Sequence, residues 1–134
     1  RLQGVRANGA ADAVYGDLVL EHWRRPRNMR ALAAPTIAHE AFNPLCGDRV
    51  RLEARVEDGV LCDVAFSANA CALCTASASL LTERARGMNT IDAARLEDDW
   101  PIHAVGTSVP AARVACATLP LRALHAALAQ LGPA

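Results

Sequence analysis

The segment from residue 49 to 57 constrains the fold more than any other part of the chain. Its sequence, RVRLEARVE, alternates apolar with charged side chains. A period of two is typical of a strand that buries one face and exposes the other. Asp58 and Gly59 follow at once, and an Asp-Gly pair favours a type I′ hairpin turn, in which both central residues need a positive φ. The pattern therefore predicts an antiparallel hairpin that pairs 49–57 with 60–67.

Helical patterns flank the predicted hairpin. Apolar residues recur at helical spacing after Asp12, which could cap this first helix, and Pro26 should end it. The remaining expectations are an extended segment over 36–42, a helix over 71–86 stopped by Gly87, a short helix over 89–98, a connector over 100–110, and a last helix over 111–131 with Pro120 in its first turn. This order predicts an α+β fold, with helices packed on a small antiparallel sheet of about three strands.

The composition excludes several classes of function. The chain has 134 residues, 52% of them hydrophobic, and a formal net charge of zero. Neither nucleic acid nor a membrane is expected as a partner, because both attract surplus positive charge. All 14 basic residues are arginine, so mechanisms that need a lysine amine are excluded. No apolar run approaches the ~20 residues that span a bilayer.

No signal segment opens the sequence, which favours a cytoplasmic location. We expect one domain over 12–134, as a monomer or a weak homo-oligomer. Residues 1–11 show no periodicity, and we expect them to be disordered or derived from expression.

Cysteines carry the most informative chemistry. There are five of them, and an odd count without a signal segment argues against a secreted disulfide framework. In an extended backbone Cys46 and Asp48 would project to one side, and Gly47 between them would let a ligand come close. Cys71 stands where a helix follows a strand, a place that favours a thiolate. With Cys116, near the start of the last helix, these groups could form one tetrahedral site for zinc or an iron–sulfur cluster.

Other interpretations of the cysteines remain open at this point. Cys71 and Cys74 form a C-x-x-C at a helix start, as in thioredoxin-type dithiols, although the preceding strands form a hairpin instead of a βαβ unit. Cys74 could equally be a small packing residue. Cys62 is expected to be an inert core residue, and Cys46 beside Gly47 could reflect turn chemistry alone.

Two further features have mainly structural interpretations. His22 lies on the first predicted helix and is expected to be structural. A local basic run forms either a solvated loop or a docking patch, and its members are Arg24, Arg25, Arg27 and Arg30.

Four stretches follow one another in the order of a known family. VYGDLVLEHWRRPRN is similar to an opening helix with an H-x-x-x-P-x-N ending, and NPLCGDRVRL to an N-P-x-C-G-D signature. ACALCTASASLLTE and ARVACATLPLRAL resemble the segments that carry the second and third cysteines. From Val14 to Leu128 the chain thus resembles the U-type iron–sulfur cluster assembly scaffold proteins, which include the N-terminal domain of NifU.

The resemblance implies a function and a ligand set. The ligands would be Cys46, Asp48, Cys71 and Cys116, with Cys46 and Cys116 as persulfide acceptors. In this family the thiols receive sulfur from a cysteine desulfurase, assemble a transient [2Fe–2S] cluster with iron, and pass it to recipient apo-proteins. Zinc can occupy the same site. An exposed thiolate of low pKa is the best acceptor of sulfur, and a carboxylate ligand, being harder and weaker than thiolate, would keep the cluster labile.

The family has two branches, and the chain shares features with both. The zinc-bound branch accepts sulfur and activates its desulfurase. The CATL stretch after Ala115 resembles this branch, but its insertion between the second and third cysteines is missing. The cluster-building branch often has a histidine where this chain has Ala115, and its proline-rich chaperone motif is absent. Cluster assembly is therefore the main hypothesis, and zinc-dependent sulfur transfer is the alternative.

Overall fold

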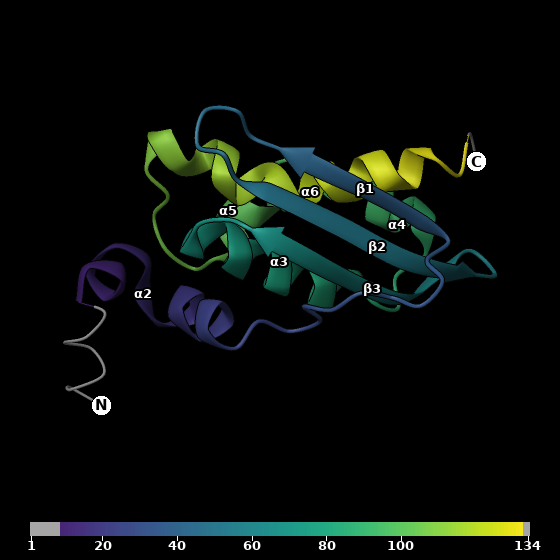
Figure 1. The fold of residues 1–134 in the computed structure, drawn as a ribbon, viewed down its shortest axis with the longest axis horizontal. Helices are drawn as coiled ribbons and strands as arrows, with labels where there is room; N and C mark the ends of the chain where they lie inside the picture. Colours follow the sequence, from purple (N-terminus) through teal and green to yellow (C-terminus); the bar gives the residue numbers. More distant parts are fainter. Residues whose placement is uncertain (1–8, 133–134) are drawn as a thin grey trace.

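The structure is a computed structural model that describes the backbone of residues 9–132 and the side chains of residues 16–132. A helix comes first, three strands follow, and further helices complete the chain (Figure 1). The predicted α+β class is confirmed. In order, the elements are α2 (Gly9–Arg24), β1 (Ile37–Phe42), β2 (Arg49–Glu57), β3 (Val60–Asn69), α3 (Ala72–Ala85), α4 (Thr90–Ala94), α5 (Trp100–Ala104), the 3₁₀ turn η1 (Ala111–Arg113) and α6 (Val114–Ala129).

The strands form one antiparallel sheet in the order β1-β2-β3. Asp58 and Gly59 join β2 to β3 with φ angles of 52° and 73°. Both values are positive, as a type I′ turn requires, so the predicted hairpin is confirmed. The β2–β3 register shifts between Arg55 and Val56, close to the turn.

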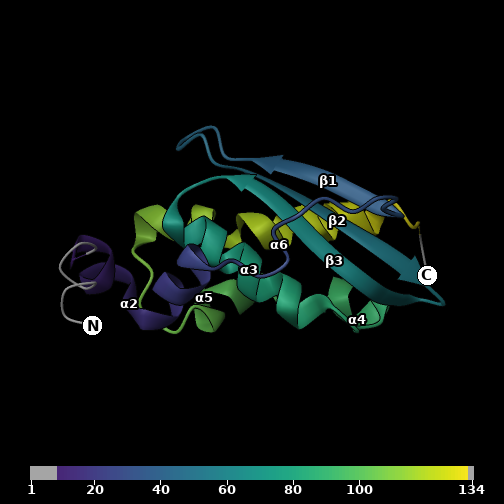
Figure 2. The same ribbon diagram turned by 60° about the horizontal axis from the view of Figure 1, so that its bottom comes forward.

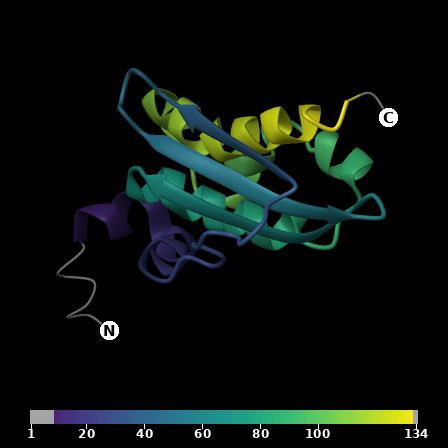
Figure 3. The same ribbon diagram turned by 45° about the vertical axis from the view of Figure 1, so that its right-hand side comes forward.

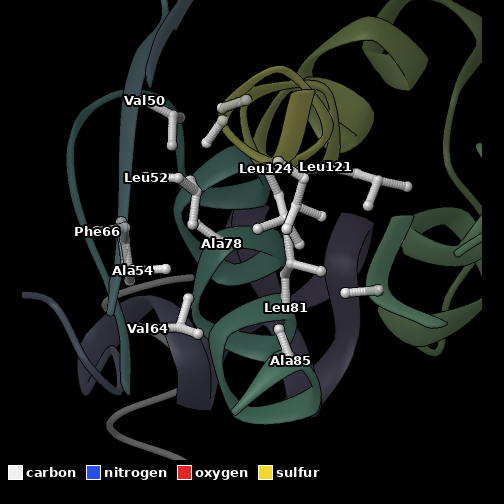
Figure 4. Packing of buried hydrophobic residues seen from close by; sticks show 14 of the residues in the cluster. Val50, Leu52, Ala54, Val64, Phe66, Ala78, Leu81, Ala85, Leu121 and Leu124 are labelled. Carbon is white, nitrogen blue, oxygen red and sulfur yellow. The ribbon is translucent and has the colours of Figure 1, made fainter. Parts of the chain in front are cut away.

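The main core lies between the sheet and the helices α3 and α6, which cover one face of the sheet (Figures 2 and 3). The apolar residues of the alternating segment point into this core, while its charged residues lie on the other face. Each fully buried Leu or Val side chain there contributes about 1.5–3 kcal/mol. Figure 4 shows the packing of Val50, Leu52 and Ala54 of β2 and Val64 and Phe66 of β3 with Ala78, Leu81 and Ala85 of α3 and Leu121 and Leu124 of α6.

Three arginines of the basic run, Arg25, Arg27 and Arg30, have acidic partners. Arg25 pairs with Glu21 at 2.6 Å, and Arg30 pairs with Asp63 of β3 at 2.7 Å. The backbone between them runs along β3, where the carbonyl of Asn28 accepts a hydrogen bond from the N–H of Phe66 at 2.9 Å. These contacts tie Arg25 and Arg30 to acidic side chains of the same chain.

Several element boundaries differ from the predictions. The first helix begins at Gly9, so the predicted start at Asp12 was wrong; the expectation of disorder over 1–11 falls mostly outside the described residues. The segment 100–110 is not only a connector, because α5 begins at Trp100 with Pro101 in its first turn, where proline is well tolerated. Within residues 9–132, no helix combines the length and the hydropathy of a membrane span.

Pro120 does not lie in the first turn of the last helix. The helix α6 begins at Val114, so Pro120 is its seventh residue and is buried. Proline has no N–H to donate to the carbonyl four residues earlier, which here belongs to Cys116. The helix begins six residues before Pro120, and its first turns pack against α3 and bury Cys116 and Ala117.

Candidate functional site

The loop between β1 and β2 is a tight turn organised by Asn43. Its backbone N–H donates to the carbonyl of Asp48 at 2.9 Å, and its own carbonyl accepts from the N–H of Gly47 at 2.7 Å. The side-chain oxygen of Asn43 accepts from the N–H of Leu45 at 3.0 Å. Gly47 has a φ of 80°, in the left-handed region that favours glycine. Cys46 and Asp48 therefore do not alternate along a strand, and that part of the prediction was wrong.

The thiol and the carboxylate on this loop differ in their exposure to solvent. Cys46 is exposed, whereas Asp48 is only 6% exposed. Leu45 is 93% exposed beside Cys46. The turn thus presents one thiol to solvent and directs the carboxylate inward.

Cys71 is the N-cap residue of α3, as its position in the sequence predicted. Its sulfur accepts a hydrogen bond from the N–H of Cys74 at 3.4 Å, and its own N–H donates to Oδ1 of Asp48 at 3.2 Å. This second bond links the start of α3 to the β1–β2 loop.

Cys116 completes the corner from the first turn of α6. Its side chain is 1% exposed, and its sulfur lies 3.4 Å from the sulfur of Cys46. The side-chain amide of Asn43 points to the Cys116 sulfur at 4.0 Å. One ligand atom from each of Cys46, Asp48 and Cys116 lies within 4.8 Å of the other two. Cys71 is outside this group of three but adjoins it through Asp48.

Asp48 has an unsatisfied oxygen that bears on metal binding. Its Oδ2 is buried and has no hydrogen-bond partner within the described part of the chain. Burying a carboxylate oxygen without a partner is costly, and a cation would satisfy it. Sulfur and carboxylate donors together suit zinc or iron. On this observation the residues fit a bound metal ion.

Burial raises the pKa of the buried thiols. It raises the pKa of Cys116 to about 12, with the hydrogen bond to Cys46 as a second cause. Burial also raises the pKa of Cys71, and the hydrogen bond from the Cys74 N–H opposes this only partly. The predicted low pKa of the thiol at the helix start was wrong, because desolvation outweighs the helix N-terminus in the metal-free protein. A bound cation would lower the pKa of the thiols that ligate it.

The two remaining cysteines lie outside the group. Cys74 is fully buried in the main core, and burial raises its pKa strongly. Its packing role is confirmed, and a thiol so buried is a poor partner for a C-x-x-C dithiol. Cys62 is exposed on β3, so its prediction as a core residue was wrong.

One functional side chain was missed from the sequence. Asn43 belongs to the N-P-x-C-G-D motif, but no role was predicted for it. The signal was present, since an Asn before Pro commonly forms a turn in which its side chain caps the following backbone. Its 5% exposure and its bonds to both ends of the loop mark it as the residue that shapes the turn.

The fold and this corner define a class of protein: a small α+β domain in which thiols and a buried carboxylate meet at one end of a three-stranded sheet. The family model of the NifU-like N terminal domain matches residues 14–132. The chain belongs to this family, which confirms the resemblance drawn from its motifs.

Individual relatives carry different names. The chain is 39% identical over 114 residues to the bifunctional protein NifU/MnmA of Rubrobacter xylanophilus, covering 84% of this chain but only 23% of that relative. It is 29% identical to the zinc-dependent sulfurtransferase SufU of Bacillus subtilis, covering 92% and 95% of the two chains. It is 30% identical to the iron–sulfur cluster assembly scaffold protein IscU 1 of Archaeoglobus fulgidus, covering 86% and 74%.

Solved structures share the fold. The crystal structure of a NifU-like N-terminal protein from Brucella abortus superposes with a TM-score of 0.74 at 25% identity, over 90% of this chain and 95% of that one. The crystal structure of a SufU-type protein from Fervidobacterium islandicum gives a TM-score of 0.75 at 21% identity, over 88% and 98% of the two chains, and supports the fold alone.

Proposed function

We propose that this protein is a scaffold that accepts sulfur and assembles a transient [2Fe–2S] cluster as its cargo. The observation that carries the proposal is the convergence of Cys46, Asp48 and Cys116 within 4.8 Å, together with the unpartnered buried oxygen of Asp48. Cys71 would be the fourth ligand, from the adjoining helix start. The name of the IscU relative, an iron–sulfur cluster assembly scaffold protein, supports this choice of cargo.

The exposure of the thiols suggests the order in which they accept sulfur. Cys46 is exposed and would be the first acceptor of persulfide sulfur from a cysteine desulfurase, while Cys116 would be a second acceptor. All five cysteines are free thiols, which suits a reducing compartment such as the cytoplasm. The completed cluster would pass to recipient apo-proteins, so each ligand must hold the iron reversibly.

Asp48 would provide this reversibility. A carboxylate binds iron more weakly than a thiolate, so the edge of the cluster at Asp48 would open first. Its Oδ1 is already held by the Cys71 N–H, which leaves Oδ2 for the metal.

Reconstitution tests the proposal directly. With iron, cysteine and a cysteine desulfurase, the protein should develop sulfur-to-iron charge-transfer absorption, and Cys46→Ala should abolish it. Cys62→Ala is the matched control, because Cys62 is also an exposed thiol but lies outside the group. Absence of these bands in the unmodified protein, with iron and sulfide both supplied, would contradict the scaffold function.

Zinc-dependent sulfur transfer is the second candidate, favoured by a relative of that name that matches over nearly its whole length. The same four residues would hold zinc, which would lower the pKa of the bound thiols and keep them as thiolates. Under this function, isolated protein contains stoichiometric zinc, and adding it raises desulfurase turnover. Equal desulfurase turnover with and without the protein would exclude zinc-dependent sulfur transfer and would leave the scaffold function open.

A further inference from the structure

The two sulfur atoms of Cys46 and Cys116 are in direct contact. They lie 3.4 Å apart, one on an exposed turn and the other on a buried helix. Cys116 is 1% exposed, and the side-chain amide nitrogen of Asn43 lies 4.0 Å from its sulfur. The buried side of the Cys46 sulfur is therefore occupied, and only its solvent side is open to an incoming group.

Resting on the proposed sulfur acceptance at Cys46, we propose that Cys116 attacks the inner sulfur of a Cys46 persulfide and releases sulfide. A sulfur delivered from solvent must bond to the open side of the Cys46 sulfur. Cys116 then approaches that sulfur from the opposite, buried side. Their separation of 3.4 Å matches the near-attack distance of about 3–3.5 Å.

The step balances without an outside reductant. A bond forms between the sulfur atoms of Cys116 and Cys46, and the bond from Cys46 to the outer sulfur breaks. The electron pair of that bond stays on the outer sulfur, which is reduced to sulfide, while the two cysteines become a disulfide. The thiol proton of Cys116 goes to the departing hydrosulfide, which leaves as hydrogen sulfide. An external dithiol reductant then restores both cysteines.

The surroundings favour this pair over the other thiols. Closing from contact distance to a disulfide of about 2.0 Å needs a small movement, and the exposed turn that carries Cys46 can supply it. The Cys71 sulfur is held by the Cys74 N–H and lies outside the group of three ligand atoms. Cys74 itself is sealed in the core. Sulfide would thus form at the site, and Cys46 and Cys116 would be available to iron once the disulfide is reduced.

Persulfide transfer to the full chain tests the inference without iron. The protein, reduced and kept with a chelator, is treated with a small cysteine persulfide donor. Released sulfide is measured with a fluorogenic probe, and the cysteines are mapped by mass spectrometry under non-reducing conditions. We expect sulfide release together with a Cys46–Cys116 disulfide. Cys116→Ser should retain the Cys46 persulfide and release sulfide at least about tenfold more slowly, whereas Cys62→Ser should behave like the unmodified protein.

The outcomes separate this inference from the function on which it rests. If Cys46 never acquires sulfur, the proposed acceptor role fails. If Cys46 carries a persulfide that decays equally in the unmodified protein and in Cys116→Ser, sulfur acceptance stands and the inference is overturned. Recovery of the extra sulfur on Cys116, without a disulfide, would also overturn it, because attack would then have occurred at the outer sulfur. Disulfide mapping on the unmodified protein decides the matter even if the variant folds poorly.

Discussion

Substituting Gly47 by alanine tests how strictly the β1–β2 turn shapes the site. Gly47 has a φ of 80°, and a Cβ built there meets nothing within 4 Å. Steric crowding therefore contributes nothing, and the cost is that of placing an L-residue in the left-handed region, about 1–2 kcal/mol. The turn can relieve this strain by rotating, which would move the Cys46 sulfur away from Cys116. We expect the free energy of unfolding of the zinc-bound protein to fall by that amount. Where rotation relieves the strain in the metal-free protein, zinc binding must restore it, and zinc affinity falls by up to about 5- to 30-fold.

Gly59→Ala is the matched control for this prediction. Gly59 has a φ of 73°, also with nothing within 4 Å of a Cβ, but lies in the distant β2–β3 hairpin. Urea denaturation should show similar destabilisation for both variants, while competition with a chromophoric chelator should show weaker zinc binding only for Gly47→Ala. Equal zinc affinity in the two variants would refute the argument that this turn positions the ligands.

Three further predictions concern the corner and its support. Asp48→Ala should lengthen the lifetime of a reconstituted cluster, followed by the decay of its visible absorption; an unchanged lifetime would remove the role given to the carboxylate. For the metal-free, reduced protein, the raised pKa of Cys116 means that the unfolded thiol ionises first, near the ordinary value of 9.0. The stability contributed by the protonated thiol is complete below pH 9 and is lost as the pH rises towards about 12. Urea titrations from pH 7.5 to 10 should show this decline, and a flat profile would contradict it. Ser79→Ala should lower the free energy of unfolding by about 1–3 kcal/mol and leave zinc affinity unchanged. The buried Ser79 hydroxyl hydrogen-bonds His22 Nδ1 at 2.7 Å and accepts a hydrogen bond from the Arg27 N–H at 2.8 Å, and the variant loses both contacts.

Local patterns predicted the sheet and most of the helices because the relevant interactions are short in range. Alternation over 49–57 assigned the buried face of β2, and the Asp58-Gly59 pair specified the turn by its backbone requirements alone. The position of Cys71 at a helix start followed from the change in composition after β3.

The failed predictions depended on contacts between distant segments. Pro120 is tolerated inside α6 because that helix packs along α3 and the sheet, which offsets the lost hydrogen bond. Cys62 turns outward on β3 near the register shift at Arg55 and Val56, which strand composition does not reveal. The pKa of the Cys71 thiol rises because neighbouring elements bury it, although its helix position alone favours ionisation.

The sequence by itself determined the chemistry available to this protein and the family to which it belongs. Its thiols, its Asp48 carboxylate and its lack of lysine are properties of the residues, whatever their arrangement. Only the tertiary structure decided which groups meet, since Cys46 and Cys116 are 70 positions apart and come into contact through the packing of α6 against the sheet. Burial then decided that Cys46 faces solvent while Cys116 lies behind it, and this asymmetry is the basis of the sulfide-releasing step.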